Sequence, residues 1–154
     1  MVNDGPEHER PNHTEEVARR IRVAFGLQKT GSRILAHVQR GLMHLHATGV
    51  AVHDREFWSI AGQELGTIRT RRMVDLPLRR PEMIAPAEWR FAILFAIREA
   101  VSIPKSELIV QTARLFGFDR TGTEIEGHIE RHLEELIGSY RFLGSETGLM
   151  VAGE

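Results

Sequence analysis

Residues 24–45 have the sequence AFGLQKTGSRILAHVQRGLMHL, and residues 115–136 have the sequence LFGFDRTGTEIEGHIERHLEEL. The two stretches align without gaps at an offset of 91 residues, and nine of the 22 aligned positions are identical. Four further positions are conservative pairs, among them Lys29 with Arg120. Chance does not readily produce such a match, so the sequence indicates a tandem duplication.

Each copy predicts a helix, a tight turn and a second helix. In the first copy, apolar residues recur at helical spacing between Thr14 and Phe25, and the glycine that follows suits a left-handed C-terminal cap. In the second copy, Thr123 and Glu126 have the spacing of a capping box, and Ser32 is the equivalent cap in the first copy. We therefore expect turn and cap roles for Gly26, Thr30, Gly31 and Ser32, and for Gly117, Thr121, Gly122 and Thr123.

Short β-hairpins are expected after both helix pairs. Strand-forming residues flank a polar turn at residues 53–55 in the first copy and a Gly-Ser pair at residues 144–145 in the second. A helix-turn-helix followed by such a hairpin is typical of winged helices. The predicted fold class is therefore mainly α, within α+β, with two winged-helix-like units in tandem.

The two predicted units differ at their front ends. Residues 86–101 begin with a proline and carry apolar side chains around so much of the predicted helix that it must be buried on more than one side. Residues 1–12 are polar, so the first unit lacks a matching leading helix. Two interpretations stay open: the chain is a piece of a longer one, or Phe91 and Phe95 cover the exposed side. The predicted division is a polar tail at 1–12, a first unit at 13–60, an Arg-rich extended connector at 61–85 and a second unit at 86–154.

The composition excludes several classes of protein. The 154 residues include 20 Lys and Arg against 21 Asp and Glu, a formal net charge of −1, which argues against a strongly basic chain that wraps nucleic acid. There is no cysteine, so disulfides, zinc fingers and thiol chemistry are excluded. The longest apolar run, residues 91–97, is too short to span a bilayer. We expect a soluble, cytoplasmic protein without a membrane segment.

Three segments carry a resemblance to a known family. They are HTEEVARRIRVAFGLQKTGSRI at 13–34, IAPAEW at 84–89 and SELIVQTARLFGFDRTGTEI at 106–125, and the motif G-x-x-[KR]-T-G-[ST]-x-I occurs in the first and the third. Over roughly residues 10–152, the chain resembles the helicase-associated domain of unknown function at the C-terminal end of large bacterial superfamily-I helicase-like proteins. Those proteins often also carry a Vsr-like endonuclease domain. The resemblance implies a module of a nucleic-acid-processing machine and implies no biochemical activity for the chain.

The second helix of the first copy carries the sharpest candidate site. Its apolar residues recur on one side, while its basic residues recur on a separate side that we expect to face solvent. Helix N-termini and cationic side chains bind phosphate, and recognition helices lie in the major groove of DNA. The second copy has glutamates on the same face, which indicates divergence of one copy toward nucleic acid and the other toward protein contact. The candidate residues are Lys29, Arg33, His37, Arg40 and His44, and the alternative is a solvated helix face without a ligand.

The predicted connector contains a second basic cluster, of which Arg69, Arg71 and Arg72 are candidate DNA-binding residues. Two interpretations stay open for these arginines. In one they follow a nucleic-acid backbone, and in the other they pair with glutamates of the second copy, since the net charge is near zero.

Metal and catalytic sites are not indicated. His44 and His46 are two residues apart, which does not place them on one helix face, and no Asp or Cys completes a ligand set. The acids of the second copy are predicted on a solvated helix without an apolar pocket to raise a pKa. No G-x-x-x-x-G-K-[ST] motif is present, which excludes ATP hydrolysis by a P-loop.

The function that we expect from the sequence is that of a non-enzymatic DNA-binding accessory module without metal or cofactor. Its partners would be duplex or single-stranded DNA and the other domains or subunits of a helicase or nuclease. The alternative is a protein-interaction or dimerisation module without direct DNA binding, which would use the apolar sides of helix 86–101 and the acidic helix 123–137.

Overall fold

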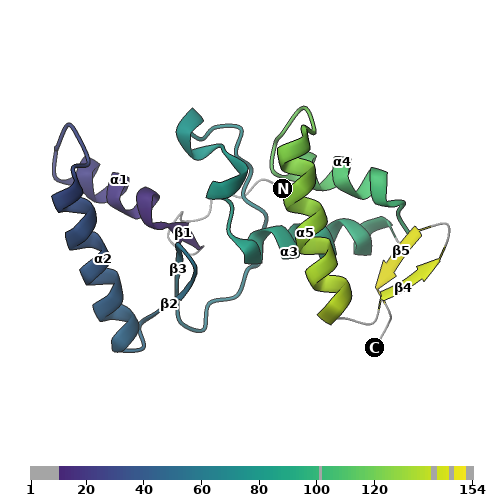
Figure 1. Ribbon diagram of the computed structural model, residues 1–154, viewed down its shortest axis with the longest axis horizontal. Helices are drawn as coiled ribbons and strands as arrows, with labels where there is room; N and C mark the ends of the chain where they lie inside the picture. Colours follow the sequence, from purple (N-terminus) through teal and green to yellow (C-terminus); the bar gives the residue numbers. More distant parts are fainter. Residues whose placement is uncertain (1–10, 101, 140–141, 146–147, 152–154) are drawn as a thin grey trace. The chain divides into compact units, whose positions relative to one another are not determined.

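Both copies of the repeat fold into two helices followed by a two-stranded hairpin (Figure 1). The computed structural model describes residues 11–100, 102–139, 142–145 and 148–151. The chain divides into a first unit, residues 1–64, and a second unit, residues 65–154. The repeated elements are α1 (Thr14–Ala24), α2 (Ser32–Ala47), β2 (Ala51–Asp54) and β3 (Phe57–Ile60) in the first unit, and α4 (Lys105–Leu115), α5 (Thr123–Ser139), β4 (Phe142–Ser145) and β5 (Gly148–Val151) in the second.

The boundaries of these elements carry the same offset as the sequence repeat. In all four pairs the two elements begin 91 residues apart, for example α1 at Thr14 and α4 at Lys105. The described part of the chain is mainly helical, with one three-stranded and one two-stranded antiparallel sheet. The prediction of a mainly α architecture within the α+β class is therefore confirmed.

The first helix of each repeat ends in the same type of cap. Gly26 and Gly117 have φ angles of 65° and 85°, in the left-handed region that glycine adopts without strain. The Leu27 N–H donates to the Arg22 carbonyl at 2.9 Å, and the equivalent bond in the second unit is 3.0 Å long. This pattern satisfies carbonyls that the helix end would leave unpaired, so each glycine ends its helix and turns the chain toward the next one.

The second helix of each repeat has its N-cap one residue earlier than predicted. The N-cap of α2 is Gly31, which has no side chain with which to cap the helix. In α5 the Glu126 N–H donates to the Gly122 carbonyl at 3.0 Å, so that glycine already accepts the first intrahelical bond. The prediction that Ser32 and Thr123 are N-caps is therefore wrong, because both are first-turn residues of their helices.

The second unit is built around α3 (Pro86–Ala100), the helix that has no counterpart in the described part of the first unit. Trp89, Ala92 and Ile93 are fully buried, and α3 packs against both α4 and α5. The Trp89 ring meets the Phe116 ring at the end of α4 edge-on, with centroids 4.6 Å apart. Burial on two sides accounts for the apolar character that the sequence shows around this helix.

The first unit gains a short extra strand, β1 (Asn12–His13), which pairs with β3 and gives the strand order β1-β3-β2. Next to it, the indole N–H of Trp58 donates to the Thr14 hydroxyl at 3.0 Å, and that hydroxyl donates to the Glu56 carbonyl at 3.0 Å. The N-cap of α1 is His13, whose Nδ1 accepts a hydrogen bond from the Glu15 N–H at 3.1 Å. These contacts tie the start of α1 to the hairpin.

The Arg-rich segment belongs to the second unit from residue 65 onward. It contains two short 3₁₀ helices, η1 (Leu76–Leu78) and η2 (Pro81–Met83). Leu78, Met83 and Ile84 are buried, so this segment contributes apolar side chains to the core of the second unit.

Candidate nucleic-acid interface

The basic residues predicted on α2 lie at the surface of the first unit. Lys29, Arg33, His37, Arg40 and His44 are all exposed. The helix contains no Asp or Glu, and within the described residues no carboxylate forms an ion pair with Lys29, Arg33 or Arg40. The His37 Nδ1–H donates to the Arg33 carbonyl at 2.8 Å, which holds the imidazole along the helix. The side chains are thus free to meet an anion without first breaking an ion pair.

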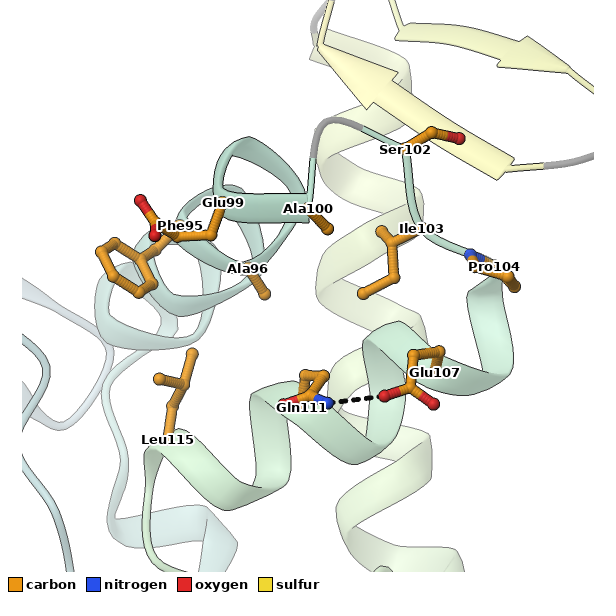
Figure 2. Close-up of a pocket in the computed structure, with 10 residues that line it drawn as sticks. All are labelled: Phe95, Ala96, Glu99, Ala100, Ser102, Ile103, Pro104, Glu107, Gln111 and Leu115. Carbon is orange, nitrogen blue, oxygen red and sulfur yellow. Dashed lines mark hydrogen bonds between the residues drawn. The ribbon is translucent and has the colours of Figure 1, made fainter.

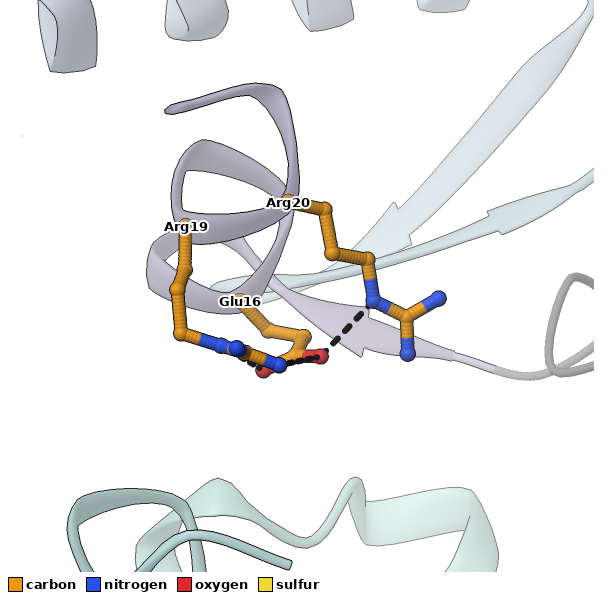
Figure 3. A network of polar contacts seen from close by, with 3 residues as sticks. All are labelled: Glu16, Arg19 and Arg20. Carbon is orange, nitrogen blue, oxygen red and sulfur yellow. Dashed lines mark hydrogen bonds and ion pairs between the residues drawn. The ribbon is translucent and has the colours of Figure 1, made fainter. Parts of the chain in front are cut away.

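The arginines of α1 differ from those of α2 because they surround a carboxylate (Figure 3). The Arg20 Nε lies 2.7 Å from Glu16 Oε1, and an Arg19 nitrogen lies 3.2 Å from the same oxygen. Burial by itself would raise the pKa of Glu16, but the hydrogen bonds and charges of the two guanidinium groups outweigh it and lower that pKa. The single carboxylate of Glu16 therefore offsets part of the positive charge of Arg19 and Arg20, whereas α2 has no carboxylate of its own.

The equivalent face of α5 is not open to solvent along its whole length. The His128 ring stacks on the Trp89 ring of α3 with centroids 5.7 Å apart. Glu135 Oε2 accepts hydrogen bonds from His132 at 3.1 Å and from Arg90 of α3 at 3.4 Å. The acidic residues keep the solvent exposure expected from the sequence, Glu135 being 41% exposed, but α3 covers the histidines on this side of α5.

The connector arginines pair with carboxylates of the second unit, as one of the two interpretations of the sequence expects. An Arg71 nitrogen donates to Glu88 Oε2 at 2.7 Å, and the two side chains are only 3% and 2% exposed. Arg69 lies 3.8 Å from the other oxygen of that carboxylate, and Arg72 pairs with Asp119 at 2.8 Å. Arg69 and Arg71 lie inward because a buried carboxylate requires cationic partners, whereas Arg72 is 59% exposed.

Two histidines of α5, the buried His132 and the half-buried His128, have lowered pKa values. Burial lowers the pKa of His132, and the hydrogen bond from its ring to Glu135 offsets only part of that effect. Burial also lowers the pKa of His128, with a further contribution from the charge of Arg131. The folded state therefore resists protonation of these rings, whereas the unfolded chain protonates them at an ordinary pKa of about 6.5.

Stability of the second unit is consequently expected to fall as the pH decreases below about 7 toward the lowered pKa values, because the unfolded chain takes up more protons than the folded one in that window. Urea unfolding at pH 7.5 and pH 5.5 tests this. The unfolding midpoint should be lower at pH 5.5, and His132→Gln should reduce the difference. Equal midpoints at the two pH values would contradict this interpretation.

A pocket of about 350 Å³ lies between α3 and α4 in the second unit (Figure 2). Its walls include Phe95, which is 41% exposed, together with the apolar side chains of Ile103 and Leu115. The carboxylates of Glu99 and Glu107 also line it, and no basic side chain does. The pocket is therefore unsuited to a phosphate and is separate from the basic residues of α2.

The described residues show neither a metal centre nor a membrane-spanning helix. Among them, no three side chains of His, Asp or Glu come together in a way that could hold a metal ion. None of their helices combines the length and the apolar character needed to cross a bilayer. Comparisons of the chain with protein-family models, with curated proteins and with solved structures give no match.

Proposed function

We propose that the chain is a non-enzymatic DNA-binding accessory module made of two winged-helix-like units. The observation that carries the proposal is the basic surface of α2 and its preceding turn, which is exposed and lacks any acidic residue within the helix. The order of helix, turn, helix and hairpin supports the winged-helix-like description. In keeping with the resemblance noted in the sequence, the module would position DNA for a helicase or nuclease in the same polypeptide or complex.

The charge distribution favours contact through one copy only. With a net charge of −1, the chain as a whole attracts no polyanion, so any DNA binding must come from a local patch. The α2 segment contains Arg33 and Arg40 and no acid, whereas the equivalent α5 contains five glutamates. DNA is therefore expected to bind through phosphate contacts to the first unit and to be repelled by α5.

Replacing Arg33 and Arg40 together with glutamate is expected to abolish detectable DNA binding without changing thermal stability, because both side chains are exposed. Fluorescence anisotropy with short labelled duplex and single-stranded DNA measures the binding. The matched control replaces Arg98 and Arg114, two exposed arginines of the second unit, with glutamate. It changes the net charge by the same amount and should retain binding.

The opposite change in α5 is expected to create or strengthen binding. Glu124 is exposed and is the counterpart of Arg33, so Glu124→Arg together with the exposed Arg131, the counterpart of Arg40, restores the basic pair on the equivalent helix. Glu135, which the sequence alone would suggest, is unsuitable because it pairs with His132 and Arg90. DNA binding that persists after the Arg33 and Arg40 reversal would reject the proposal. Absence of binding together with a concentration-dependent dimer would favour an interaction module.

A further inference from the structure

Equivalent apolar residues of the two units differ sharply in burial. Phe25 is 76% exposed, whereas its counterpart Phe116 is fully buried. Leu45 is 40% exposed, whereas its counterpart Leu136 is 2% exposed. The repeat therefore makes the same apolar face twice and leaves it uncovered in the described part of the first unit.

The second unit shows what kind of element fits this face. There, α3 packs on α4 and α5, and its Trp89 ring lies near three rings, at centroid distances of 4.6 Å from Phe116, 5.7 Å from His128 and 6.4 Å from His132. The counterparts of these three residues in the first unit are Phe25, His37 and Gly41. A Cβ added to Gly41 would meet nothing within 4 Å, so no atom of the first unit covers α2 at this position.

Charge distinguishes the expected occupant from α3 itself. Arg90 of α3 pairs with Glu135, but the counterpart of Glu135 in the first unit is His44. The counterpart of Glu124 is Arg33, and α2 has no acidic residue. A helix that fits the first unit therefore needs an acidic side chain where α3 has Arg90.

Neither α3 nor the sequence of residues 1–10 supplies such a helix. Trp89, Ala92 and Ile93 are fully buried within the second unit, so α3 is already used there. Residues 1–10 contain Met1 and Val2 as their only large apolar side chains, which is too few for an apolar helix face.

We propose that the uncovered α1–α2 face, formed by Phe25, His37, Gly41 and Leu45, binds an α-helix of a partner protein. The helix carries apolar residues on one side, an aromatic residue at the place of Trp89 and an acidic residue directly after it. This inference does not require DNA binding, because it rests on the comparison of the two units, although His37 and His44 are also among the candidate DNA-binding residues. Arg131 is the counterpart of Arg40, and it stays exposed in the second unit although α3 is in place. A helix bound to the first unit is therefore expected to leave Arg40 accessible.

The test uses a synthetic helix and the full chain. The peptide has the sequence of residues 81–100 with Arg90→Glu, and a hydrocarbon staple joins positions 95 and 99, which are both exposed in α3. Titration calorimetry should give a dissociation constant in the micromolar range. The same peptide with Arg90 retained should bind about tenfold more weakly, and the peptide with Trp89→Ala at least about tenfold more weakly.

Variants of the chain locate the binding site. Phe25→Glu should abolish peptide binding and leave DNA binding intact. The combined variant Arg33→Glu with Arg40→Glu should abolish DNA binding. Met73→Glu, at a position 93% exposed in the second unit, is the control and should change neither. If Phe25→Glu alters folding, the Trp89→Ala peptide still tests the proposal, because it leaves the chain unchanged.

Three outcomes would overturn the proposal. These are absence of binding by every peptide at millimolar concentration, equal binding with and without the Trp89 ring, and binding that Phe25→Glu leaves unaffected. Sedimentation of the chain alone tests a different occupant. A concentration-dependent dimer that Phe25→Glu abolishes would assign the face to a second molecule of the same chain and so contradict the partner helix.

Discussion

Gly117→Ala is expected to destabilise the second unit by about 3 kcal/mol, the sum of a left-handed backbone cost of about 1–2 kcal/mol and an overpacking cost of similar size. Gly117 has a φ of 85°, and a Cβ built there lies 2.6 Å from both Arg72 Cγ and Thr70 Oγ1. Neither atom is the far end of a long side chain. The Arg71 N–H also donates to the Phe116 carbonyl at 2.7 Å, which holds this segment in place.

Gly26→Ala is the matched control for this prediction. Gly26 is the equivalent residue of the repeat and has a φ of 65°, but a Cβ there meets nothing within 4 Å. The substitution should therefore cost only the backbone part, about 1–2 kcal/mol. Hydrogen exchange of backbone amides reports on each unit separately and gives both values. Equal costs at the two glycines would show that the contacts around Gly117 do not constrain it.

Glu88→Ala is expected to destabilise the second unit by about 3–5 kcal/mol, because it leaves the Arg71 guanidinium buried without its carboxylate. The two side chains are 2% and 3% exposed and 2.7 Å apart. Glu88 also accepts a hydrogen bond from the Ala85 N–H at 3.3 Å, which stabilises the start of α3. Urea unfolding followed by tryptophan fluorescence measures the loss, and hydrogen exchange of backbone amides assigns it to the second unit.

A double replacement distinguishes a buried charge from a simple packing defect. Glu88→Leu combined with Arg71→Met removes both charges while keeping apolar volume, and it should recover a large part of the stability that Glu88→Ala loses. If the double variant is as unstable as the single one, the ion pair is not the source of the effect. If Glu88→Ala causes a loss below about 1 kcal/mol, Arg71 has an alternative partner.

The sequence was sufficient to predict the helix, turn, helix and hairpin of each repeat, because local physical rules determine them. Gly26 and Gly117 allow a left-handed cap, and the apolar residues on both sides of the turn recur at helical spacing. Each N-cap of the second helices lies one residue before the predicted position. Gly31 and Gly122 are compatible both with an extended cap conformation and with a turn, and the local sequence does not show which of these two conformations they adopt.

The features that could not be predicted depend on contacts between distant residues. Arg71 has the sequence context of a surface arginine, and its burial follows from Glu88, which is 17 residues away and on another element. The sequence pattern also treats Phe25 and Phe116 as equivalent, and their different burial depends on whether a helix such as α3 is present beside them. The one signal available was the broad apolar surface of residues 86–100, which indicated a helix buried on more than one side.

The proposal that α2 binds DNA through phosphate contacts is tested most directly by the salt dependence of the affinity. Fluorescence anisotropy with one short duplex, from about 50 to 200 mM salt, gives the slope of log K against log salt for the wild-type chain, for Arg40→Gln and for the control Arg114→Gln. We expect the affinity of the wild type to fall steeply with salt, and Arg40→Gln to flatten the slope by about 0.9, the value for one lost phosphate contact, with no change for Arg114→Gln. Binding that does not respond to salt, or a slope that Arg40→Gln leaves unchanged, would contradict the proposal.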